Sequence, residues 1–239
     1  MILNRRKALL TLPLLAGSAA LLASCSDNEG DNENVTPSPQ NNDTPENVPP
    51  VGSQEIDGIT YTMMPEFLSI GGGPTTENKL RIYEDLQCPY CADLKEEISE
   101  DLKKLIEDEE VVVEFVVVNY LGESSTNSWS ESTANLLAVV AESQPDKFMK
   151  VQKTLYDNQP DKDNTDPFTG EQLRKIVEEV IEFSEGEVKK IDEGFYVDWV
   201  NEVVNPFAAA NAVSSIPTVV WNETVLENYG DIVNILSGL

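Results

Sequence analysis

Residues 84–91, EDLQCPYC, decide the fold of this chain because they place two cysteines between a strand and a helix. Upstream, residues 79–86 alternate loosely between apolar and polar side chains, which is typical of a β-strand. Downstream, residues 89–108 carry apolar side chains at spacings of three and four, which predicts an amphipathic helix. Residues 111–118 are almost wholly apolar and β-branched, as in a strand buried on both faces. This order of strand, helix and strand predicts a βαβ unit.

The rest of the chain predicts a helical block and then a short hairpin with a closing helix. We expect a break at Asn205 and Pro206, where Asn can cap one helix and Pro can begin the next. The result is an α/β protein with a mixed sheet and a helical insertion at about residues 124–204. The expected elements are helices at 128–143, 145–158, 170–183 and 187–213, strands at 217–221 and 224–229, and a helix at 231–236.

The chemistry is expected to reside in Cys88 and Cys91. Cys88 lies at the start of the helix with Pro89 at the first helical position, where unpaired backbone N–H groups and the helix dipole favour a thiolate. The pKa of Cys88 should therefore be lowered. Cys91 lies on the apolar stripe one turn later and should be less exposed than Cys88. An exposed attacking thiol and a shielded resolving thiol suit exchange through a mixed disulfide.

Other interpretations of the two cysteines are weaker. A metal site would need further Cys or His ligands, and the chain has three cysteines and no histidine. A structural disulfide across so short a loop would restrain little of the unfolded chain. Two unrelated buried cysteines would not explain the position between strand and helix. The lack of histidine also excludes Ser–His–Asp triads and other His-based catalysis.

The composition excludes a nucleic-acid partner. The 239 residues include 43 acidic and 16 basic ones, for a net charge of −27, whereas phosphate binding needs clustered Lys and Arg. We interpret the acidic excess as a solvated surface. With 40% hydrophobic residues the chain can form a core, and a monomer is expected. No flavin, nicotinamide or haem motif is present, so no cofactor and no metal are expected.

Residues 1–24 are interpreted as an export signal. A basic segment at residues 5–7 precedes an uncharged run that is too short for a good membrane span. The run ends in LASC, residues 22–25, which resembles a bacterial lipobox and implies cleavage before Cys25 and lipid on its sulfur. An ordinary signal peptide with an incidental cysteine is the alternative. The sequence leaves open whether export is by the Sec or the twin-arginine route.

Residues 25–55 are expected to be a disordered tether behind the lipidated cysteine. Residues 26–55 contain seven acidic residues, no basic ones and repeated Asn, Pro and Ser. Such a composition buries too little apolar surface to offset the entropy of ordering. The folded domain should therefore span residues 56–239, held by its lipid on the outer face of the cell membrane.

The cysteine stretch resembles the active-site strand and turn of DsbA-like proteins of thioredoxin fold. Residues 155–160, LYDNQP, resemble part of the helical insertion of that family. Residues 205–210, NPFAAA, and 216–218, IPT, resemble the lead-in to its cis-proline loop. The resemblance runs from about Glu66 to the C-terminus. It implies a thioredoxin-like fold with an inserted helical subdomain, and thiol–disulfide oxidoreductase activity.

The resemblance also implies roles for individual residues. Cys88 would be the nucleophile and Cys91 the resolving cysteine. Pro217 would be cis and lie opposite the two sulfurs, in a substrate-binding loop with Ile216 and Thr218. The backbone of Ile216 would bind an extended substrate by strand-like hydrogen bonds. An ordinary trans proline at the start of a strand is the alternative.

The chain departs from the family pattern at several positions. The dipeptide between the cysteines is Pro89-Tyr90, whereas the best-known strong oxidases of the family have His before the second cysteine. Ile82 occupies the position where the family commonly places a buried acid that moves protons. Glu84 and Asp85 could relay protons instead, although a surface role is equally open. The string at residues 95–97, KEE, is interpreted as a solvated helix face.

The leading hypothesis is oxidation of dithiols in exported proteins. The alternatives are a disulfide reductase or isomerase supplied with electrons by a membrane partner, and a binding or chaperone-like lipoprotein with an idle disulfide. In either redox direction a membrane redox partner is needed, since the chain has no redox cofactor motif. The sequence does not set the direction, because the potential does not transfer with the fold.

Overall fold

The computed structural model describes residues 45–122, 126–161 and 164–239. The expected signal peptide, Cys25 and most of the tether therefore lie outside the described residues. Within the described part of the chain, no helix combines the length and the apolar character that a membrane crossing requires.

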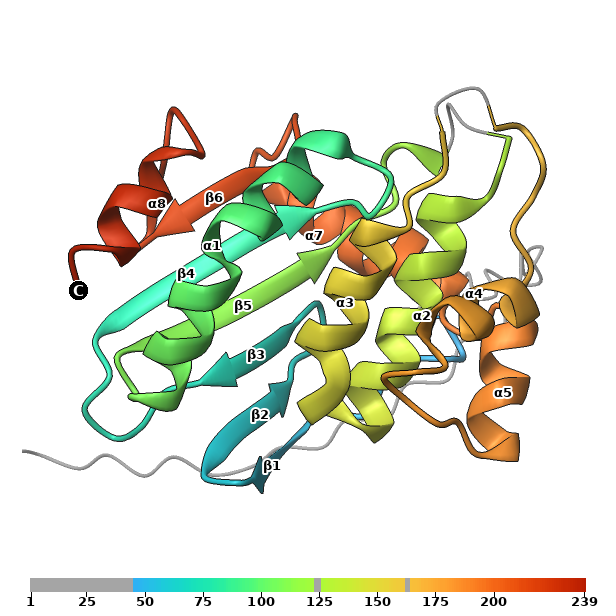
Figure 1. Cartoon of the computed structure of the whole chain (residues 1–239), viewed down its shortest axis with the longest axis horizontal. Helices are drawn as coiled ribbons and strands as arrows, with labels where there is room; N and C mark the ends of the chain where they lie inside the picture. The colour runs from blue at the N-terminus through green and yellow to red at the C-terminus, as the bar shows by residue number, and fades with distance from the viewer. Residues whose placement is uncertain (1–44, 123–125, 162–163) are drawn as a thin grey trace, which may run out of the picture. The chain divides into compact units, whose positions relative to one another are not determined.

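A parallel strand pair forms the centre of the sheet and confirms the predicted βαβ unit. β4 (Asn78–Glu84) and β5 (Val111–Val117) pair in parallel, and α1 (Pro89–Glu107) makes the crossover that a parallel pair requires. Figure 1 shows α1 crossing one face of this pair. Leu80 and Leu102, one from β4 and one from α1, are fully buried, so the core lies between the sheet and this helix.

Three antiparallel strands precede this unit, and the sequence analysis did not predict them. They extend the sheet beyond β5, giving the strand order β1-β2-β3-β5-β4-β6-β7. Gly71, at the end of the third strand, has a φ of 89° and packs so closely on Val111 that a Cβ atom would clash with its carbonyl oxygen. The strands are β1 (Gly52–Ile56), β2 (Ile59–Met63) and β3 (Leu68–Gly71).

The expected boundary between tether and domain at residue 56 is wrong, because β1 begins at Gly52. Four of its five residues are exposed, so it lacks the apolar alternation by which a strand is recognised. Pairing with β2 orders it instead, and the hydroxyls of Ser53 and Thr62 hydrogen-bond across the pair at 2.8 Å.

The other edge of the sheet agrees with the sequence analysis. β6 (Thr218–Trp221) pairs antiparallel with β4, and β7 (Thr224–Val225) returns beside it as a hairpin. The closing helix α8 (Asp231–Leu236) lies on the same face of the sheet as α1 (Figure 1).

Helices fill the chain between β5 and β6, as expected for a helical insertion. Figure 1 shows α2, α4 and α5 grouped beside the end of the sheet, with α3 next to α1. α4 ends at Val177, six residues before the end of the helix expected at residues 170–183. The helices are α2 (Trp129–Ser143), the short 3₁₀ turn η2 (Pro145–Lys147), α3 (Phe148–Asp157), α4 (Gly170–Val177) and α5 (Glu185–Asp192).

The predicted break at Asn205 and Pro206 is wrong. α6 (Val197–Trp199), the π-helical segment η3 (Val200–Val204) and α7 (Asn205–Ala210) follow one another without a break, and Asn205 has helical φ and ψ. Proline cannot donate the backbone hydrogen bond of a regular turn, and the π-helical segment η3 lies directly before the turn that contains Pro206. The chain breaks instead near Gly194, whose φ of 64° suits glycine.

Candidate active site

The two cysteines lie at the junction between β4 and α1. Cys88 is the N-cap residue of α1 with Pro89 at the first helical position, and Cys91 follows in the first turn. The backbone N–H of Cys88 donates to Asp85 O at 2.9 Å, which forms a tight turn after the strand. Both thiols are free.

The expected difference in exposure between the thiols is wrong. Cys88 is 4% exposed and Cys91 is 2% exposed, so the sulfur expected to attack is almost as buried as its partner. Tyr90, between them, is 60% exposed and marks where the site meets solvent. The two cysteines differ in electrostatics rather than in exposure.

The pKa values of the two thiols move in opposite directions. Hydrogen bonding from the Cys91 thiol lowers the pKa of Cys88 to about 7, helped by the backbone N–H groups of Cys91 and Tyr90 and opposed by burial. Burial raises the pKa of Cys91 far above its ordinary value, and the interaction with Cys88 raises it further. At neutral pH, Cys88 is therefore partly thiolate, whereas Cys91 stays a thiol.

The loop before β6 lies against Cys88. The Cys88 thiol donates to Ile216 O at 3.7 Å, and the Ile216–Pro217 peptide bond is cis, which confirms the predicted isomer. Thr218 begins β6 and pairs with Tyr83 of β4, and its hydroxyl donates to Ser215 O at 2.6 Å. The loop is thus held beside the cysteines by the sheet itself.

Glu84 is buried behind the cysteines, so the surface alternative for this residue is wrong. It is 2% exposed, and its carboxylate accepts a hydrogen bond from the Tyr156 hydroxyl at 2.9 Å and another from Gln152 Nε2. Burial raises the pKa of Glu84 to about 7, although Lys95 and the two donors favour its charged form. Burial likewise lowers the pKa of Lys95 to about 8, against the effect of Glu84.

A cavity of about 10 Å³ joins these groups. Its lining includes Glu84, Cys91, Lys95 and Pro217, together with Ile82. Ile82 and Glu84 are two residues apart on β4 and therefore lie on the same face of the sheet. The DsbA-like family commonly has its buried acid at the position of Ile82. In this chain the buried acid is Glu84, two residues further along β4 on the same face of the sheet.

The raised pKa of Glu84 predicts a loss of stability with rising pH. Between its ordinary value of 4.5 and about 7, the unfolded chain has released this proton while the folded protein still holds it, so stability falls as pH rises. The expected change across this window is about 3 kcal/mol. Glu84→Gln keeps the hydrogen-bond acceptor and should lose this part of the pH dependence.

Urea unfolding of wild type and Glu84→Gln at several pH values between 4.5 and 7 measures the effect as a difference. Glu96→Gln is the matched control, because it makes the same chemical change at an exposed carboxyl of α1. Parallel curves for wild type and Glu84→Gln would contradict the raised pKa.

Asp85 is also buried, but its carboxylate holds the site in shape. It accepts hydrogen bonds from Gln87 N at 2.8 Å, Leu121 N at 2.9 Å and Ser130 Oγ at 2.6 Å. Burial raises its pKa, and these three donors oppose that shift. The donors tie the end of β4 to the chain after β5 and to α2, so Asp85 positions the active-site turn.

Two residues of the insertion hold the same turn, and sequence reasoning missed their role. Gln159 Nε2 donates to Leu86 O at 2.7 Å and to Cys88 O at 3.1 Å. Trp129 Nε1 also donates to Leu86 O, at 2.9 Å, from a fully buried position on α2. The only sequence signal was the segment 155–160, which resembled the family without indicating a contact.

Lys95 is a second residue that sequence reasoning misplaced. It was interpreted as part of a solvated helix face, yet it is 4% exposed. Its ammonium group lies 5.1 Å from the centre of the Phe115 ring. The two glutamates that follow it in the sequence conceal a buried lysine, because its burial depends on tertiary packing, including that of α3 on α1.

Comparisons with known proteins agree with this geometry. The family model described as thioredoxin matches residues 69–235. DsbA from Mycobacterium tuberculosis in its reduced form has a TM-score of 0.61 and 22% identity, covering 72% of this chain and 91% of that chain. MdbA from Corynebacterium diphtheriae, a thiol-disulfide oxidoreductase, has a TM-score of 0.61 and 19% identity, covering 72% of this chain and 89% of that chain. BdbD from Bacillus subtilis, in its oxidised form, has a TM-score of 0.58 and 20% identity, covering 70% of this chain and 90% of that chain. No curated protein sequence matches the chain.

The fold and the dithiol at the start of α1 define a thiol–disulfide oxidoreductase with a thioredoxin-like fold. The chain belongs to the thioredoxin family. Its helical insertion gives it the DsbA-like form of that fold. Among the residues that the structure describes, no group of three or more His, Cys, Asp or Glu side chains could hold a metal ion.

Proposed function

We propose that the protein oxidises dithiols to disulfides in exported proteins outside the cytoplasmic membrane. The observation that carries exchange through Cys88 is the electrostatic difference between the thiols, because Cys88 has a pKa of about 7 while that of Cys91 is strongly raised. Cys88 is thus the better leaving group and the thiolate available for exchange at neutral pH. The oxidising direction is proposed from the likeness in fold to DsbA and MdbA. DsbA and MdbA, which share the fold, support the same class of substrate.

In the oxidising direction, a substrate thiolate attacks Cys88 of the Cys88–Cys91 disulfide. The new bond joins the substrate to Cys88, and Cys91 leaves as a thiolate that takes up a proton. A second substrate thiolate then attacks the substrate sulfur of the mixed disulfide, which forms the substrate disulfide and releases the Cys88 thiolate. Two electrons now reside in the dithiol, and a membrane redox partner removes them.

Glu84 is proposed as the group that exchanges the proton of Cys91. Both line the cavity of about 10 Å³, which is close to the space that one water molecule needs to bridge them. A pKa of about 7 allows the carboxyl to give and accept a proton at neutral pH. An unchanged rate and pH profile of exchange in Glu84→Gln would remove this role.

The substrate is proposed to bind over the loop of Ile216, Pro217 and Thr218. The contact between the Cys88 thiol and Ile216 O supports this, because a substrate sulfur on Cys88 would lie beside free strand-like backbone. The exposed ring of Tyr90 adds apolar contact area next to the attacking sulfur.

The alkylation rate of Cys88 tests the proposed difference between the thiols. In the reduced protein, the rate of reaction with iodoacetamide should rise with a midpoint near pH 7, because only the thiolate reacts. Both proteins carry Cys25→Ser, so that in Cys88→Ser the only thiol left is that of Cys91, which should stay unreactive throughout the neutral range. A midpoint for Cys88 near that of an ordinary thiol, about 8.5, would refute the activation.

A lipid on Cys25 is proposed to hold the domain at the membrane, on the basis of the LASC sequence at residues 22–25. Cys25→Ala, or treatment of cells with globomycin, should leave unprocessed precursor, because lipidation precedes cleavage of such signals. Ser24→Ala, which keeps a small residue, is the matched control and should be processed as wild type. Normal cleavage and release of Cys25→Ala would count against the anchor.

Two alternatives remain distinguishable from the proposed oxidase. A reductase or isomerase would use the same cysteines with a lower reduction potential. A binding protein with an idle disulfide would show no exchange with glutathione.

A further inference from the structure

A pocket of about 540 Å³ lies between α1 and α3, away from the exposed side of the cysteines. Its floor is formed by β2 and β3, through Ile59, Tyr61 and Ile70. Ile106 of α1 and Met149 of α3 continue this apolar lining. The volume lies in the range of pockets that bind small molecules.

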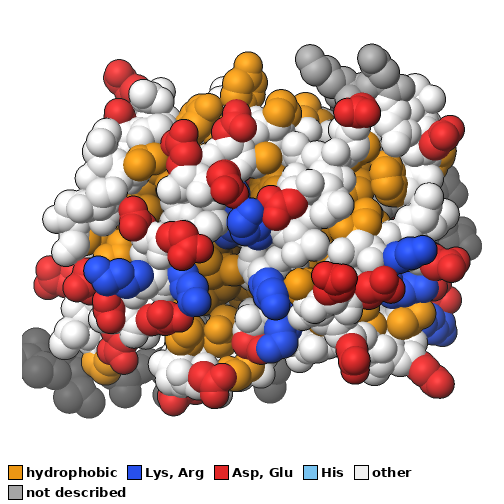
Figure 2. All heavy atoms as spheres, in the orientation of Figure 1, with side chains coloured by type: hydrophobic (Ala, Val, Ile, Leu, Met, Phe, Trp, Pro, Cys, Tyr) orange, Lys and Arg blue, Asp and Glu red, His pale blue; other side chains and the backbone are white. Residues whose placement is uncertain are grey.

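Basic side chains gather in this pocket although the chain is strongly acidic. Of 16 basic residues in the whole chain, four line it: Lys95, Lys103, Lys150 and Lys153. In Figure 2, Lys and Arg side chains surround a hollow with hydrophobic atoms in the middle of this face, while acidic side chains dominate its surroundings. Four carboxylates also line the pocket, Glu100, Glu107, Asp146 and Asp157, so its lining combines apolar walls with equal numbers of basic and acidic side chains.

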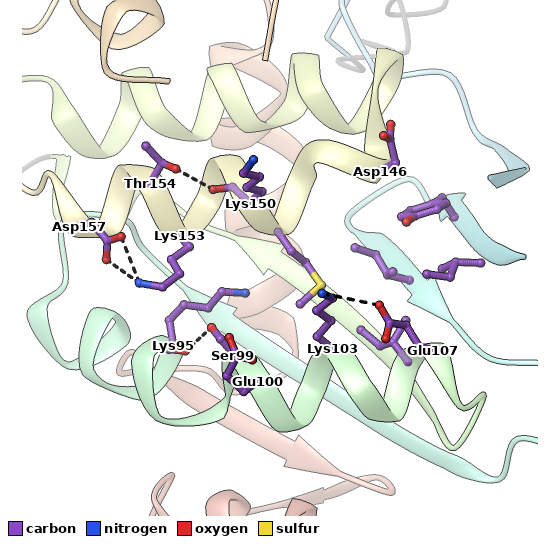
Figure 3. Close-up of a pocket in the computed structure, with 15 residues that line it drawn as sticks. Lys95, Ser99, Glu100, Lys103, Glu107, Asp146, Lys150, Lys153, Thr154 and Asp157 are labelled. Atoms are coloured by element: carbon purple, nitrogen blue, oxygen red, sulfur yellow. Dashed lines mark hydrogen bonds and ion pairs between the residues drawn. The ribbon is translucent and has the colours of Figure 1, made fainter. Parts of the chain in front are cut away.

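The pocket has a charged end and an apolar end. Lys153 of α3 pairs with Glu96 of α1 at 2.8 Å and raises the electrostatic cost of charge on Lys95, so these lysines lie together. At the other end, Tyr61 lies near Asp146 and Glu107, whose charges raise its pKa. Figure 3 shows the side chains of Lys95 and Lys153 in the gap between the two helices, with the amino group of Lys153 turned to Asp157 and that of Lys95 turned the opposite way.

Lys95 is the decisive residue of the charged end. Its Nζ is buried and has no hydrogen-bond partner among the described residues. The Phe115 ring contacts the ammonium group but leaves its N–H donors unsatisfied. Glu84 favours the charged form of Lys95 from the side of the cysteines but does not hydrogen-bond to it. A buried ammonium group without a hydrogen bond is costly, and an anionic group in the pocket that accepts its hydrogen bonds would remove that cost.

The other lysines differ in how far they are already neutralised. Lys103 pairs with Glu107 at 3.8 Å, and Lys153 pairs with Asp157 at 2.9 Å as well as with Glu96. Lys150 makes no ion pair with any described residue. These pairs also take up Glu107 and Asp157, and Asp146 pairs with Lys147 at 2.5 Å. Of the charged lining residues, Lys95, Lys150 and Glu100 remain without an ion pair among the described residues, and their net charge of one positive unit fits a ligand with one negative charge and not a polyanion.

We propose that this pocket binds a small amphipathic monoanion, a single acidic head on an apolar body, with the head at Lys95 and the body against Ile59, Ile70 and Met149. The source is either a free organic acid or a lipid of the adjoining membrane with an anionic head. The two sources share this chemistry, and the experiment below separates them.

Octanoate and 1-octanol are suitable probes, because both have eight carbon atoms but only octanoate is charged. Each is titrated by calorimetry into the full chain carrying Cys25→Ser. Octanoate should bind at least tenfold more tightly than 1-octanol. Lys95→Met should abolish that preference, because it retains the length of the side chain and removes its charge. Lys104→Met, an exposed lysine of α1 outside the pocket, is the matched control and should bind as wild type.

A second variant keeps the proposal testable if Lys95→Met does not fold. Met149→Trp should fill the apolar end and weaken binding of both probes at least tenfold, while dithiol exchange stays unchanged. Sedimentation with phosphatidylglycerol vesicles that depends on Lys95 would identify a membrane lipid as the source, and binding of octanoate alone would identify a free acid. Equal affinity for octanoate and 1-octanol, or undiminished octanoate binding by Lys95→Met, would overturn the proposal.

Discussion

Cys88→Ser is expected to abolish dithiol exchange, and Cys91→Ser to accumulate mixed disulfides with its substrates. The Cys88 thiolate attacks a substrate disulfide, joining one substrate sulfur to Cys88 and releasing the other as a thiolate. In the wild type the Cys91 thiolate then displaces the bound substrate from Cys88, whereas in Cys91→Ser only the released substrate thiolate can reverse the step. Without Cys91 the adduct persists, and a serine hydroxyl at that position can still donate the hydrogen bond that lowers the pKa of Cys88.

Non-reducing gels and mass spectrometry of the two variants measure the adducts. Turnover of a reduced, unfolded two-cysteine model protein should fall at least a thousandfold in both variants, because each lacks the disulfide. Ser99→Ala, about two turns after Cys91 on α1, is the control for expression and folding. Adducts in Cys88→Ser and none in Cys91→Ser would reverse the roles of the two cysteines.

The centre of the fold could be predicted because its signals are local. The apolar β-branched run of β5, the apolar spacing of α1 and the cysteines between β4 and α1 each indicate one structure. The cis-proline loop followed from family resemblance. β1 could not be predicted, since its exposed polar residues are ordered by pairing with β2 and not by their own burial.

The electrostatics of the site could be predicted only in part. The lowered pKa of Cys88 followed from its position at the helix start, and the structure agrees. Burial of Glu84 and Lys95 depends on how α3 packs against α1 and β4, which no local pattern specifies. Tyr156, Gln152 and Gln159 reach the site from the insertion, across about seventy residues of sequence.

The dipeptide between the cysteines should set how strongly the protein oxidises. The thiolate of Cys88, with a pKa of about 7, is less stabilised than that of DsbA, whose pKa is about 3.5. A less stable thiolate means a less oxidising disulfide, and each tenfold in that equilibrium is worth about 30 mV. Tyr90 contributes no positive charge, so Tyr90→His should lower the pKa of Cys88 and raise the potential. An unchanged potential in Tyr90→His would refute the role of the dipeptide.

The reduction potential of the Cys88–Cys91 couple tests the proposed oxidation most directly. It is measured by equilibrating the full chain carrying Cys25→Ser with glutathione buffers at pH 7 and quantifying the alkylated thiols. We predict a value between about −120 mV and about −270 mV, the values of DsbA and thioredoxin. A potential at or below that of thioredoxin would contradict the oxidase and favour the reductase.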